Sequence, residues 1–213
     1  MQNYIFDFDL TLIDSGRVNV LSTQAAFEKM GWEKPTPETV SYYTGIPIEQ
    51  SFPKMAPDNA TNEQIQKLLT VFVHEYEKLE PGNLKLFPGI KDALTTLHQA
   101  GKQLFIATSN RTEVVTRNTK ALGIYDYFDE IVGFDQVEKA KPEPDTVLKI
   151  VADHHLDKNE TIMIGDATFD LEMGKNAGVH TAGVLWGAHD KQALINVHPD
   201  YLLDQTSQLL DIK

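Results

Sequence analysis

Short apolar runs recur along the chain, and most of them are followed at once by polar residues. The runs lie at residues 4–6, 104–107, 131–134, 161–164 and 181–185. Apolar runs of this length, bounded by turn-forming residues, are typical of the buried strands of a parallel sheet. The stretches between them carry helical periodicity, as in residues 144–155, where apolar residues form one face. The alternation predicts an α/β fold with a doubly wound, mostly parallel sheet, and a last short strand at residues 201–203 along its edge.

The segment from residue 16 to residue 82 has helical patterns but no convincing strand. Its clearest helix follows an apolar stripe with i, i+3, i+4 and i+7 spacing, made by Ile65, Leu68, Leu69, Phe72, Val73 and Tyr76, and an earlier helix carries Val18, Leu21 and Ala25. Turn-forming pairs stand at both ends, Ser15-Gly16 and Pro81-Gly82, and could serve as hinges. The sequence therefore predicts a Rossmann-like core of residues 1–15 and 83–213, interrupted by an all-helical cap of residues 16–82. The cap either moves on its hinges or is fixed rigidly to the core.

Two aspartates end the first apolar run, in the sequence Asp7-Phe8-Asp9. Side chains two residues apart on a strand share a face, so both carboxylates can converge on one point. A pair of buried carboxylates is costly unless a cation or a shared proton compensates it. A divalent metal is the natural candidate, although an aspartate after a strand can also simply cap a turn.

Two clusters further along the chain are suited to an anion. Thr108-Ser109-Asn110 follows a predicted strand and precedes a predicted helix, so its hydroxyl, amide and backbone donors gather at a helix N-terminus, where they can bind an anion or cap the helix. Lys141 stands beside a proline that rigidifies the loop, and a fixed ammonium suits a phosphate. A lysine in a charged loop, such as Lys139 two residues away, is otherwise typically solvated.

The fourth cluster, Gly165-Asp166-Ala167-Thr168-Phe169-Asp170, follows the run at residues 161–164. It places a third carboxylate at a strand end and a fourth about one helical turn later, where a capped strand-to-helix turn is the plainer interpretation. Together with Asp7 and Asp9, these aspartates supply the oxygen ligands that Mg²⁺ prefers. The histidines lack metal-ligand spacing, and we expect solvated or helix-end positions for them, among them His154, His155, His180, His189 and His198.

Composition narrows the class of partner. The formal net charge of -12, from 19 basic and 31 acidic residues, opposes nonspecific binding to nucleic acid or to anionic lipid. The chain has no cysteine, no signal-like N-terminus and no apolar stretch approaching the ~18 residues of a membrane span. We expect a cytoplasmic protein, a monomer or homodimer, with no nucleic-acid or membrane partner. An anionic substrate would need a local cation in its site.

Taken in chain order, the four clusters resemble the motifs of the haloacid dehalogenase superfamily, in its phosphoglycolate phosphatase-like branch. The nucleophile motif is matched by Asp7-Phe8-Asp9-Leu10-Thr11, the second by Thr108-Ser109-Asn110, the third by Lys141-Pro142 and the fourth by residues 165–170. Residues 16–82 resemble the helical cap, so the likeness covers practically the whole chain. In the fold it implies, the first strand lies between the second and the fourth, so that the loops after these strands meet.

The resemblance implies a Mg²⁺-dependent phosphatase that hydrolyses a small phosphorylated metabolite through an aspartyl phosphate. Asp7 would be the nucleophile and Asp9 the general acid and then the general base. The phosphoryl oxygens would be held by Thr108, Ser109, Asn110 and Lys141. The metal would be held by Asp7, the backbone carbonyl of Asp9 and Asp166, with Asp170 steadying this shell or ligating directly.

One residue departs from the family pattern: Leu10 stands where the motif usually has glycine. We expect altered loop packing with activity retained, provided that the loop keeps its conformation and thereby the position of Asp9. In the cap, Arg17, Tyr42, Tyr43 and Gly45 are candidates for substrate specificity, although the tyrosines can equally pack inside the cap.

Three rival functions remain to be weighed. A sugar phosphomutase would pass the same phosphoryl group to a sugar hydroxyl instead of water. A haloalkanoate dehalogenase is less favoured, because its chemistry needs no metal and would give Asp9 no catalytic role. A catalytically silent binding module would have replaced Asp7, Asp9, Lys141 or Asp166, and all four are present. The motifs do not name the substrate, which leaves phosphoglycolate, pyrophosphate, sugar phosphates and nucleoside monophosphates open.

Overall fold

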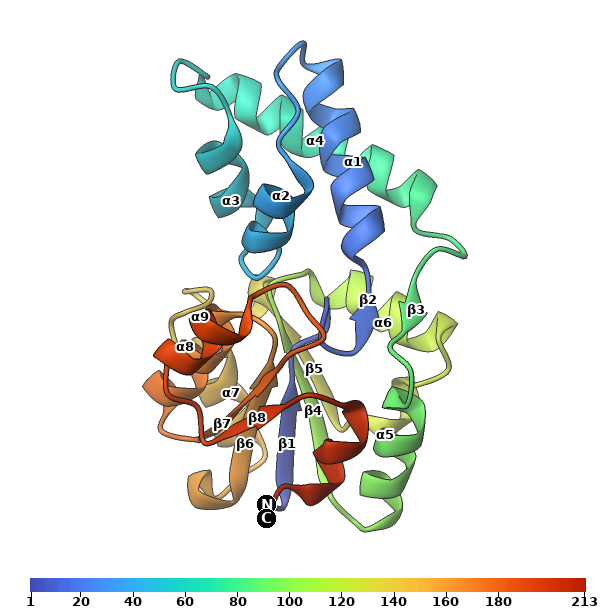
Figure 1. Cartoon of the computed structure of the whole chain (residues 1–213), viewed down its shortest axis with the longest axis vertical. Coiled ribbons are helices and arrows are strands. Elements are labelled where there is room, and N and C mark those ends of the chain that lie inside the picture. The colour runs from blue at the N-terminus through green and yellow to red at the C-terminus, as the bar shows by residue number, and fades with distance from the viewer.

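Six parallel strands form the sheet at the centre of the lower lobe of the molecule (Figure 1), in a computed structural model that describes all 213 residues. The strands are β1 (Asn3–Phe6), β4 (Gln103–Thr108), β5 (Glu130–Gly133), β6 (Thr161–Gly165), β7 (His180–Val184) and β8 (Tyr201–Leu203). Their order is β5-β4-β1-β6-β7-β8, and every neighbouring pair is parallel. The structure confirms the predicted sheet, with β1 between β4 and β6 and the last strand at the edge.

Helices cover both faces of this sheet. They are α5 (Ile90–Gln99), α6 (Thr112–Ala121), α7 (Asp145–Asp153), α8 (Thr168–Ala177) and the short α9 (Lys191–Asn196). Along β1, Tyr4 and Phe6 pack in one buried cluster with side chains of α5 and α6, whereas Ile5 packs in a second cluster with side chains of α7 and α8. Alternate residues of a strand point to opposite faces, so the continuous apolar runs fill two cores at once. This is the doubly wound arrangement that the sequence predicts.

Four helices form the upper lobe, which is the predicted all-helical cap (Figure 1). They are α1 (Gly16–Lys29), α2 (Pro37–Tyr43), α3 (Ile48–Met55) and α4 (Asn62–Leu79). The cap has its own buried cluster, centred on Phe27, Phe52, Leu68 and Phe72. A capping box between Thr61 and Gln64 starts α4, satisfying two backbone groups that the first helical turn would otherwise leave unpaired.

The predicted apolar stripes differ from the buried faces at three positions. Leu21 and Val73 are exposed, at 41% and 45% of their surface. In α1 the buried face runs instead through Val18, Ser22 and Ala26, which have i, i+4, i+8 spacing. Because Ser22 is polar, the apolar pattern of the sequence does not indicate this face. Ala25 lies beside the buried face and is only half-buried.

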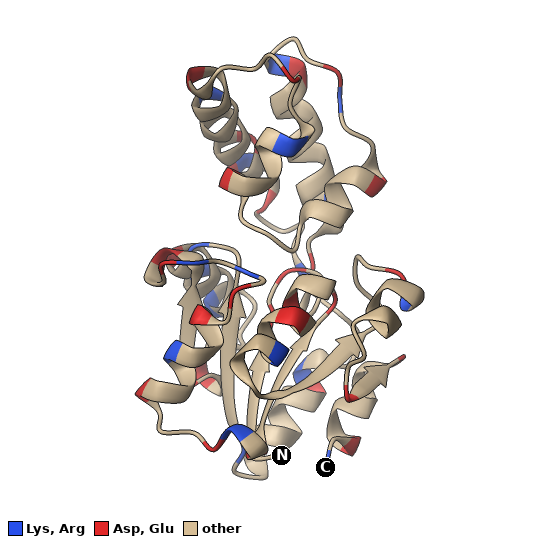
Figure 2. Ribbon diagram, turned by 90° about the vertical axis from the view of Figure 1, so that its left-hand side faces the viewer, with Lys and Arg blue, Asp and Glu red and all other residues tan.

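The two lobes are joined by a small antiparallel pair of strands, β2 (Ile13–Asp14) and β3 (Lys85–Leu86), which the sequence does not predict. In the view turned by 90°, the cap stands at one end of the core, and lysine and arginine residues are scattered over both lobes (Figure 2). The domain boundaries at residues 15/16 and 82/83 lie next to this connector and stay a prediction, as does any hinge motion. None of the helices combines the length and the apolar character needed to cross a membrane.

Candidate active site

The polar clusters converge where three neighbouring strands end, at the edge of the sheet that faces the cap. Asp7 directly follows β1, Thr108 ends β4 and Asp166 directly follows β6. Because β1 lies between β4 and β6, this edge is the point at which the strand order reverses, where ligands of such sheets bind. The loop before α7 adds Lys141 to the same point.

The Lys141 ammonium lies at the centre of the site. Its Nζ donates hydrogen bonds to Asp7 Oδ1 at 2.5 Å and to Asp170 Oδ1 at 2.7 Å, and its side chain is 2% exposed. A solvated surface position for Lys141 is therefore wrong, whereas Lys139 is exposed. Burial of a lysine is tolerated here because two carboxylates pair with it.

Backbone and hydroxyl donors fix the other carboxylates. Asp166 accepts hydrogen bonds from the Thr11 hydroxyl at 2.9 Å and from the Ala188 amide at 2.7 Å. Asp170 Oδ2 accepts the amide of Ala167 at 3.0 Å, so Asp170 also caps the start of α8. The backbone passes close to Asp170: a Cβ at Gly165 would lie 2.3 Å from the Asp170 side chain, so this position requires glycine.

Charge in this cluster is unbalanced. One oxygen each of Asp7, Asp166 and Asp170 lies within 4.8 Å of the others, and all three residues are buried. Three carboxylates and the single Lys141 ammonium leave a formal charge of -2. An all-oxygen donor set with this charge fits a hard divalent cation such as Mg²⁺.

The pKa directions agree with that imbalance. Burial raises the pKa of Asp7 well above its usual range, against the opposing effect of Lys141. Burial, with the Asp170 charge added, raises the pKa of Asp166 to about 7. Burial alone would lower the pKa of Lys141, but the Asp170 and Asp7 carboxylates outweigh it and raise that pKa. The carboxylates therefore resist ionising together until a further cation compensates them.

Asp9 lies apart from this cluster and lines the cavity between the lobes. Burial raises its pKa, opposed by hydrogen bonding to Ser15 and Asn110, and the Asn110 amide nitrogen lies 3.5 Å from Asp9 Oδ2. A raised pKa favours the protonated form, which suits a group that must donate a proton.

Leu10 adopts the conformation that the usual glycine would supply. Its φ is +60°, in the left-handed region, and its side chain is 6% exposed. Its amide donates to the Ile13 carbonyl at 2.8 Å, which closes the turn after Asp9. The loop thus has a glycine-like backbone although a leucine occupies it, at a cost of roughly 1–2 kcal/mol.

The second cluster, Thr108-Ser109-Asn110, does not cap a helix. The helix α6 begins at Thr112, and Asp135 Oδ1 accepts the Thr112 amide at 2.8 Å. The Thr108 hydroxyl accepts the Asn110 amide at 3.1 Å, and the Ser109 hydroxyl donates to the cap carbonyl of Gly45 at 3.0 Å. All three residues line the cavity, while Ser109 also ties the core to the cap.

Of the two positions expected for the histidines, solvated or at a helix end, His189 takes the helix end, beside the start of α8. It is buried, its Nδ1 accepts the Thr168 amide at 3.1 Å, and its Nε2 lies 3.2 Å from the carbonyl of Tyr42 in the cap. Its ring stacks on Tyr42, with centroids 5.0 Å apart. His189 therefore links the loop that holds Asp166 to the cap.

Sequence reasoning missed the loop after β7 that contains His189. This loop also supplies the Ala188 amide, and a Cβ at Gly187 would lie 2.1 Å from Asp166. The signal was available, because residues 186–190 follow a buried parallel strand just as the four recognised clusters do.

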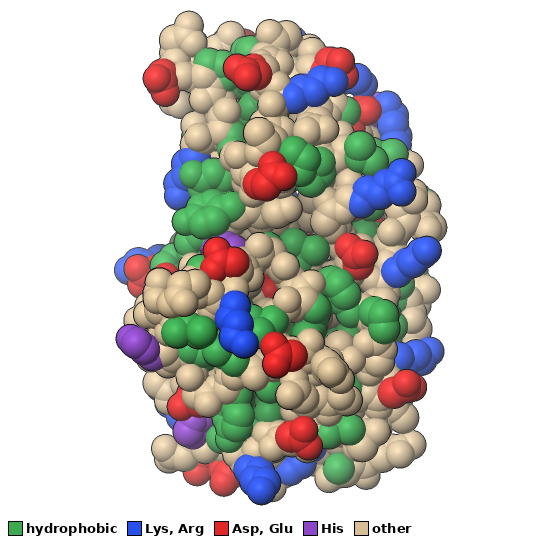
Figure 3. All heavy atoms as spheres, in the orientation of Figure 1, with side chains coloured by type: hydrophobic (Ala, Val, Ile, Leu, Met, Phe, Trp, Pro, Cys, Tyr) green, Lys and Arg blue, Asp and Glu red, His purple; other side chains and the backbone are tan.

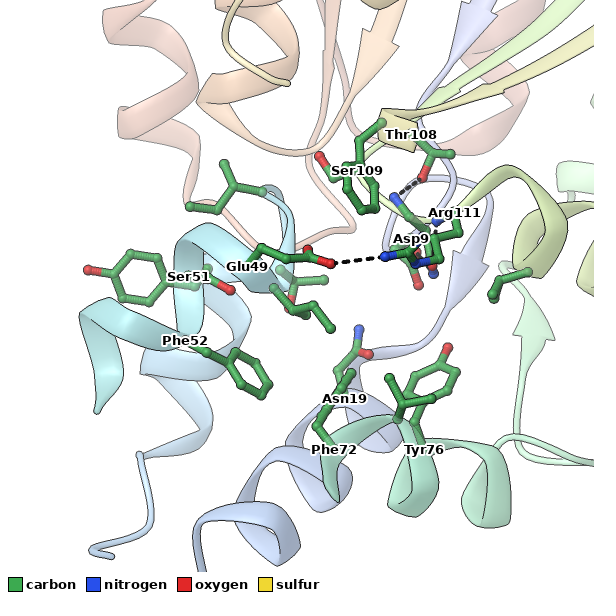
Figure 4. Close-up of a pocket in the computed structure, with 18 of the residues that line it drawn as sticks. Asp9, Asn19, Glu49, Ser51, Phe52, Phe72, Tyr76, Thr108, Ser109 and Arg111 are labelled. Carbon is green, nitrogen blue, oxygen red and sulfur yellow. Dashed lines mark hydrogen bonds and ion pairs between the residues drawn. The ribbon is translucent and has the colours of Figure 1, made fainter. Parts of the chain in front are cut away.

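A cavity of about 340 Å³ separates the core carboxylates from the cap (Figure 4). Of the proposed specificity residues, Tyr43 lines this cavity, whereas Arg17 is exposed and does not. Tyr42 is half-exposed and stacks on His189 of the core, so it does not pack inside the cap. Gly45 packs against Ala167 and Phe169 of the core. Of the four candidates, only Tyr43 is therefore placed to contact a substrate in the cavity. One contact between the cap and the core runs through the end of α2 and the α2–α3 loop.

Comparisons with known proteins agree with this geometry. The sequence model of the haloacid dehalogenase-like hydrolases matches residues 4–184. The pyrophosphatase PpaX of Listeria welshimeri is 30% identical over 210 residues, and that of Halalkalibacterium halodurans is 31% identical over 213, each alignment covering 98% of this chain and 94% of the relative.

Solved structures share the whole architecture. A haloacid dehalogenase-like family hydrolase from Streptococcus pneumoniae superposes with a TM-score of 0.87 at 26% identity, covering 99% of this chain and 97% of that one. A predicted phosphoglycolate phosphatase from Haemophilus somnus gives a TM-score of 0.90 at 21% identity with the same coverage, and shows the fold alone.

A doubly wound parallel sheet with a helical cap over buried carboxylates at its switch point defines a capped, Rossmann-like α/β protein. The chain belongs to the haloacid dehalogenase-like hydrolase family.

Proposed function

We propose that the protein is a Mg²⁺-dependent phosphatase that hydrolyses a small-molecule phosphate monoester through an aspartyl phosphate, as in the phosphoglycolate phosphatase-like branch of its family. The observation that carries this proposal is the buried Asp7 carboxylate, held by Lys141 beside Asp166 and Asp170 at the floor of a cavity large enough for a small metabolite.

Asp7 performs the first step as nucleophile. One of its carboxylate oxygens attacks phosphorus, and the bond between phosphorus and the ester oxygen breaks. Asp9 gives its proton to the departing oxygen, for which its raised pKa is suited. The products of this step are the free alcohol and an aspartyl phosphate on Asp7.

Asp9 then acts as general base in the second step. It takes a proton from a water molecule that attacks phosphorus, and the bond to the Asp7 oxygen breaks. Inorganic phosphate leaves, while Asp7 returns as a carboxylate and Asp9 in its protonated form. Thr108, Asn110 and Lys141 hold the phosphoryl oxygens, and Ser109 supports their loop through Gly45.

The metal would be held by Asp7, Asp166 and the backbone carbonyl of Asp9, with Asp170 steadying the cluster through Lys141. When bound, Mg²⁺ supplies positive charge that screens the nucleophile from the anionic phosphate. The formal charge of -2 in the cluster supports a divalent ion.

Phosphate release tests the proposal. Wild type is assayed with small phosphate esters in Mg²⁺ and in EDTA, beside Asp7→Asn and the control Asp14→Asn, which changes an exposed aspartate of β2. The proposal requires Mg²⁺-dependent release that Asp7→Asn abolishes and Asp14→Asn retains. Equal rates in wild type and Asp7→Asn would contradict it.

Two rival functions have their own signatures in the same assay. Transfer to a sugar hydroxyl without release of phosphate would indicate a phosphomutase. Bound metal without turnover of any ester would indicate a binding module. The cytoplasmic location and the monomeric or homodimeric state stay predictions.

A further inference from the structure

The cavity has two unlike faces. The core face carries Asp7, Asp9, Thr108 and Asn110, which serve a phosphoryl group. Most of the apolar side chains that line the cavity come from the cap, among them Ile46, Ile48, Phe52, Phe72 and Val73. Hydrophobic side chains are also visible at the surface where the two lobes meet (Figure 3). A substrate with its phosphate on the core therefore places its leaving group against an apolar wall.

The cap wall offers no cation to a leaving group. The charged cap residues that line the cavity are Glu49 and Glu77. The two arginines of the cavity belong to the core, and both face carboxylates: Arg111 lies 3.4 Å from Glu49, and Arg117 pairs with Glu80. On the cap side, a second phosphate or a carboxylate on the substrate would meet apolar side chains, uncharged polar side chains and the two glutamates, which together disfavour an anion.

One donor on the cap wall has no partner. The Tyr76 residue is only 8% exposed, and its buried hydroxyl makes no hydrogen bond. Its ring points from α4 toward the core side of the cavity (Figure 4). Burial raises the pKa of Tyr76 well above its usual range, so the hydroxyl keeps its proton. It is therefore placed to donate to an oxygen of a bound ester, and a buried donor gains from such a partner.

The size of the cavity agrees with an organic leaving group. Its volume of about 340 Å³ corresponds to roughly ten water molecules at ~30 Å³ each. A small inorganic substrate would leave much of this space as water against the apolar wall, which is unfavourable.

We infer that the enzyme selects phosphate monoesters whose leaving group is uncharged and partly apolar, over pyrophosphate and over esters with a carboxylated leaving group. The inference rests on the proposed phosphatase function. The inferred substrate preference differs from the substrate that the name pyrophosphatase gives for its relatives. The apolar cap wall holds the leaving group, and Tyr76 donates a hydrogen bond to an oxygen of the ester.

A matched pair of esters tests the selection. Benzyl phosphate and 4-carboxybenzyl phosphate have the same benzylic ester bond and differ by one charge. The inference predicts kcat/KM at least about tenfold higher for benzyl phosphate, and lower still for pyrophosphate. Equal values, or a preference for either anionic compound, would overturn it.

Two variants on α4 test whether the cap wall of the cavity causes the substrate preference. Val73→Lys adds a cation to an exposed position of the cap wall, and His74→Lys adds one at the next residue, which does not line the cavity. Val73→Lys should reduce the preference for benzyl phosphate by about tenfold, whereas His74→Lys should leave it unchanged. Equal effects of the two variants would contradict a role for the cap wall.

Tyr76→Phe keeps the ring and removes the donor. It should lower kcat/KM for benzyl phosphate by about fivefold, with the affinity for Mg²⁺ unchanged. An unchanged kcat/KM would remove Tyr76 from the inference.

A binding measurement separates this inference from the proposed function. Calorimetry with benzylphosphonate and 4-carboxybenzylphosphonate, which cannot be hydrolysed at the ester position, reports selection without turnover. If no ester is hydrolysed, the phosphatase proposal fails, while tighter binding of benzylphosphonate would still support the selection. If esters are hydrolysed but the two phosphonates bind equally, the phosphatase proposal stands and the selection is contradicted.

Discussion

Replacing Lys141 by methionine should destabilise the protein strongly, because it removes the one buried cation of the carboxylate cluster. Methionine has a similar length and no charge, so the change leaves the packing of the side chain largely intact. Three buried carboxylates would then lack the ammonium that lies 2.5 Å from Asp7 and 2.7 Å from Asp170.

The size of the effect follows from the burial of these groups. Removing one partner of a buried ion pair costs about 3–5 kcal/mol, since the remaining charge stays away from water. For a chain of 213 residues, each kcal/mol corresponds to about 2–4 °C in Tm, so we expect a loss of roughly 6–20 °C without metal.

The loss should depend on pH in a definite direction. Burial raises the pKa of Asp166 to about 7 in the folded protein, above the unfolded value near 4. A carboxyl group with a raised pKa weakens the native state as pH rises through the folded pKa, and this weakening is absent below the unfolded pKa. The deficit of Lys141→Met should therefore be larger at pH 8 than at pH 5.

Urea unfolding in EDTA, at both pH values, measures the deficit directly. Lys139→Met is the matched control, because Lys139 is exposed two residues away, and we expect it to stay within about 0.5 kcal/mol of wild type. Similar small losses for Lys141→Met and Lys139→Met would refute the argument that Lys141 compensates buried carboxylates.

Three further predictions concern other parts of the chain. Asp200→Asn should cost about 1 kcal/mol near neutral pH, measured by urea unfolding, because Asp200 accepts the amide and hydroxyl of Thr181. Burial tends to raise the pKa of Asp200, but these hydrogen bonds outweigh it and lower the pKa. The difference in unfolding free energy between Asp200→Asn and wild type should therefore persist above about pH 4 and vanish as pH falls through the lowered pKa. Leu10→Gly relieves a left-handed leucine but loses a buried side chain worth about 1.5–3 kcal/mol, so thermal unfolding should show net destabilisation rather than a gain. Glu80→Gln replaces a buried carboxylate that accepts from Arg117 and Asn118, and should lower Tm by several degrees; an unchanged Tm would show that this contact between the cap linker and α6 contributes nothing.

The core sheet could be predicted because each strand is buried on both faces and reads as an unbroken apolar run. The same rule fails for β2 and β3, which have two residues each and depend on the contact between the lobes. In the cap, α4 was predictable from its long stripe, whereas α3 contains Pro53 and is only 8 residues long. Short helices of this kind take their stability from packing, which sequence periodicity does not report.

The site was predictable where chemistry is local and not where it depends on tertiary contacts. Asp7, Lys141 and Asp166 stand in recognisable positions at strand ends or beside a proline. Tyr76 has no such signal, because its importance comes from the core surface opposite the cap. His189 does follow a strand end, but its contact with Tyr42 depends on the position of the cap, which the sequence pattern does not report. At Leu10, the backbone adopts the left-handed conformation although leucine disfavours it, so the residue type alone would predict a different loop.

The central claim, that Asp7 carries the phosphoryl group, can be tested by trapping the phosphorylated protein. Asp9→Asn removes the base for the second step, while 4-nitrophenyl phosphate has a leaving group that needs no proton for the first. Acid-quenched Asp9→Asn protein incubated with Mg²⁺ and this ester should carry one phosphoryl group on the peptide that contains Asp7, and the double variant Asp7→Asn, Asp9→Asn should carry none. Phosphate on another residue, or an unmodified Asp7 peptide while 4-nitrophenol is still released, would contradict the account.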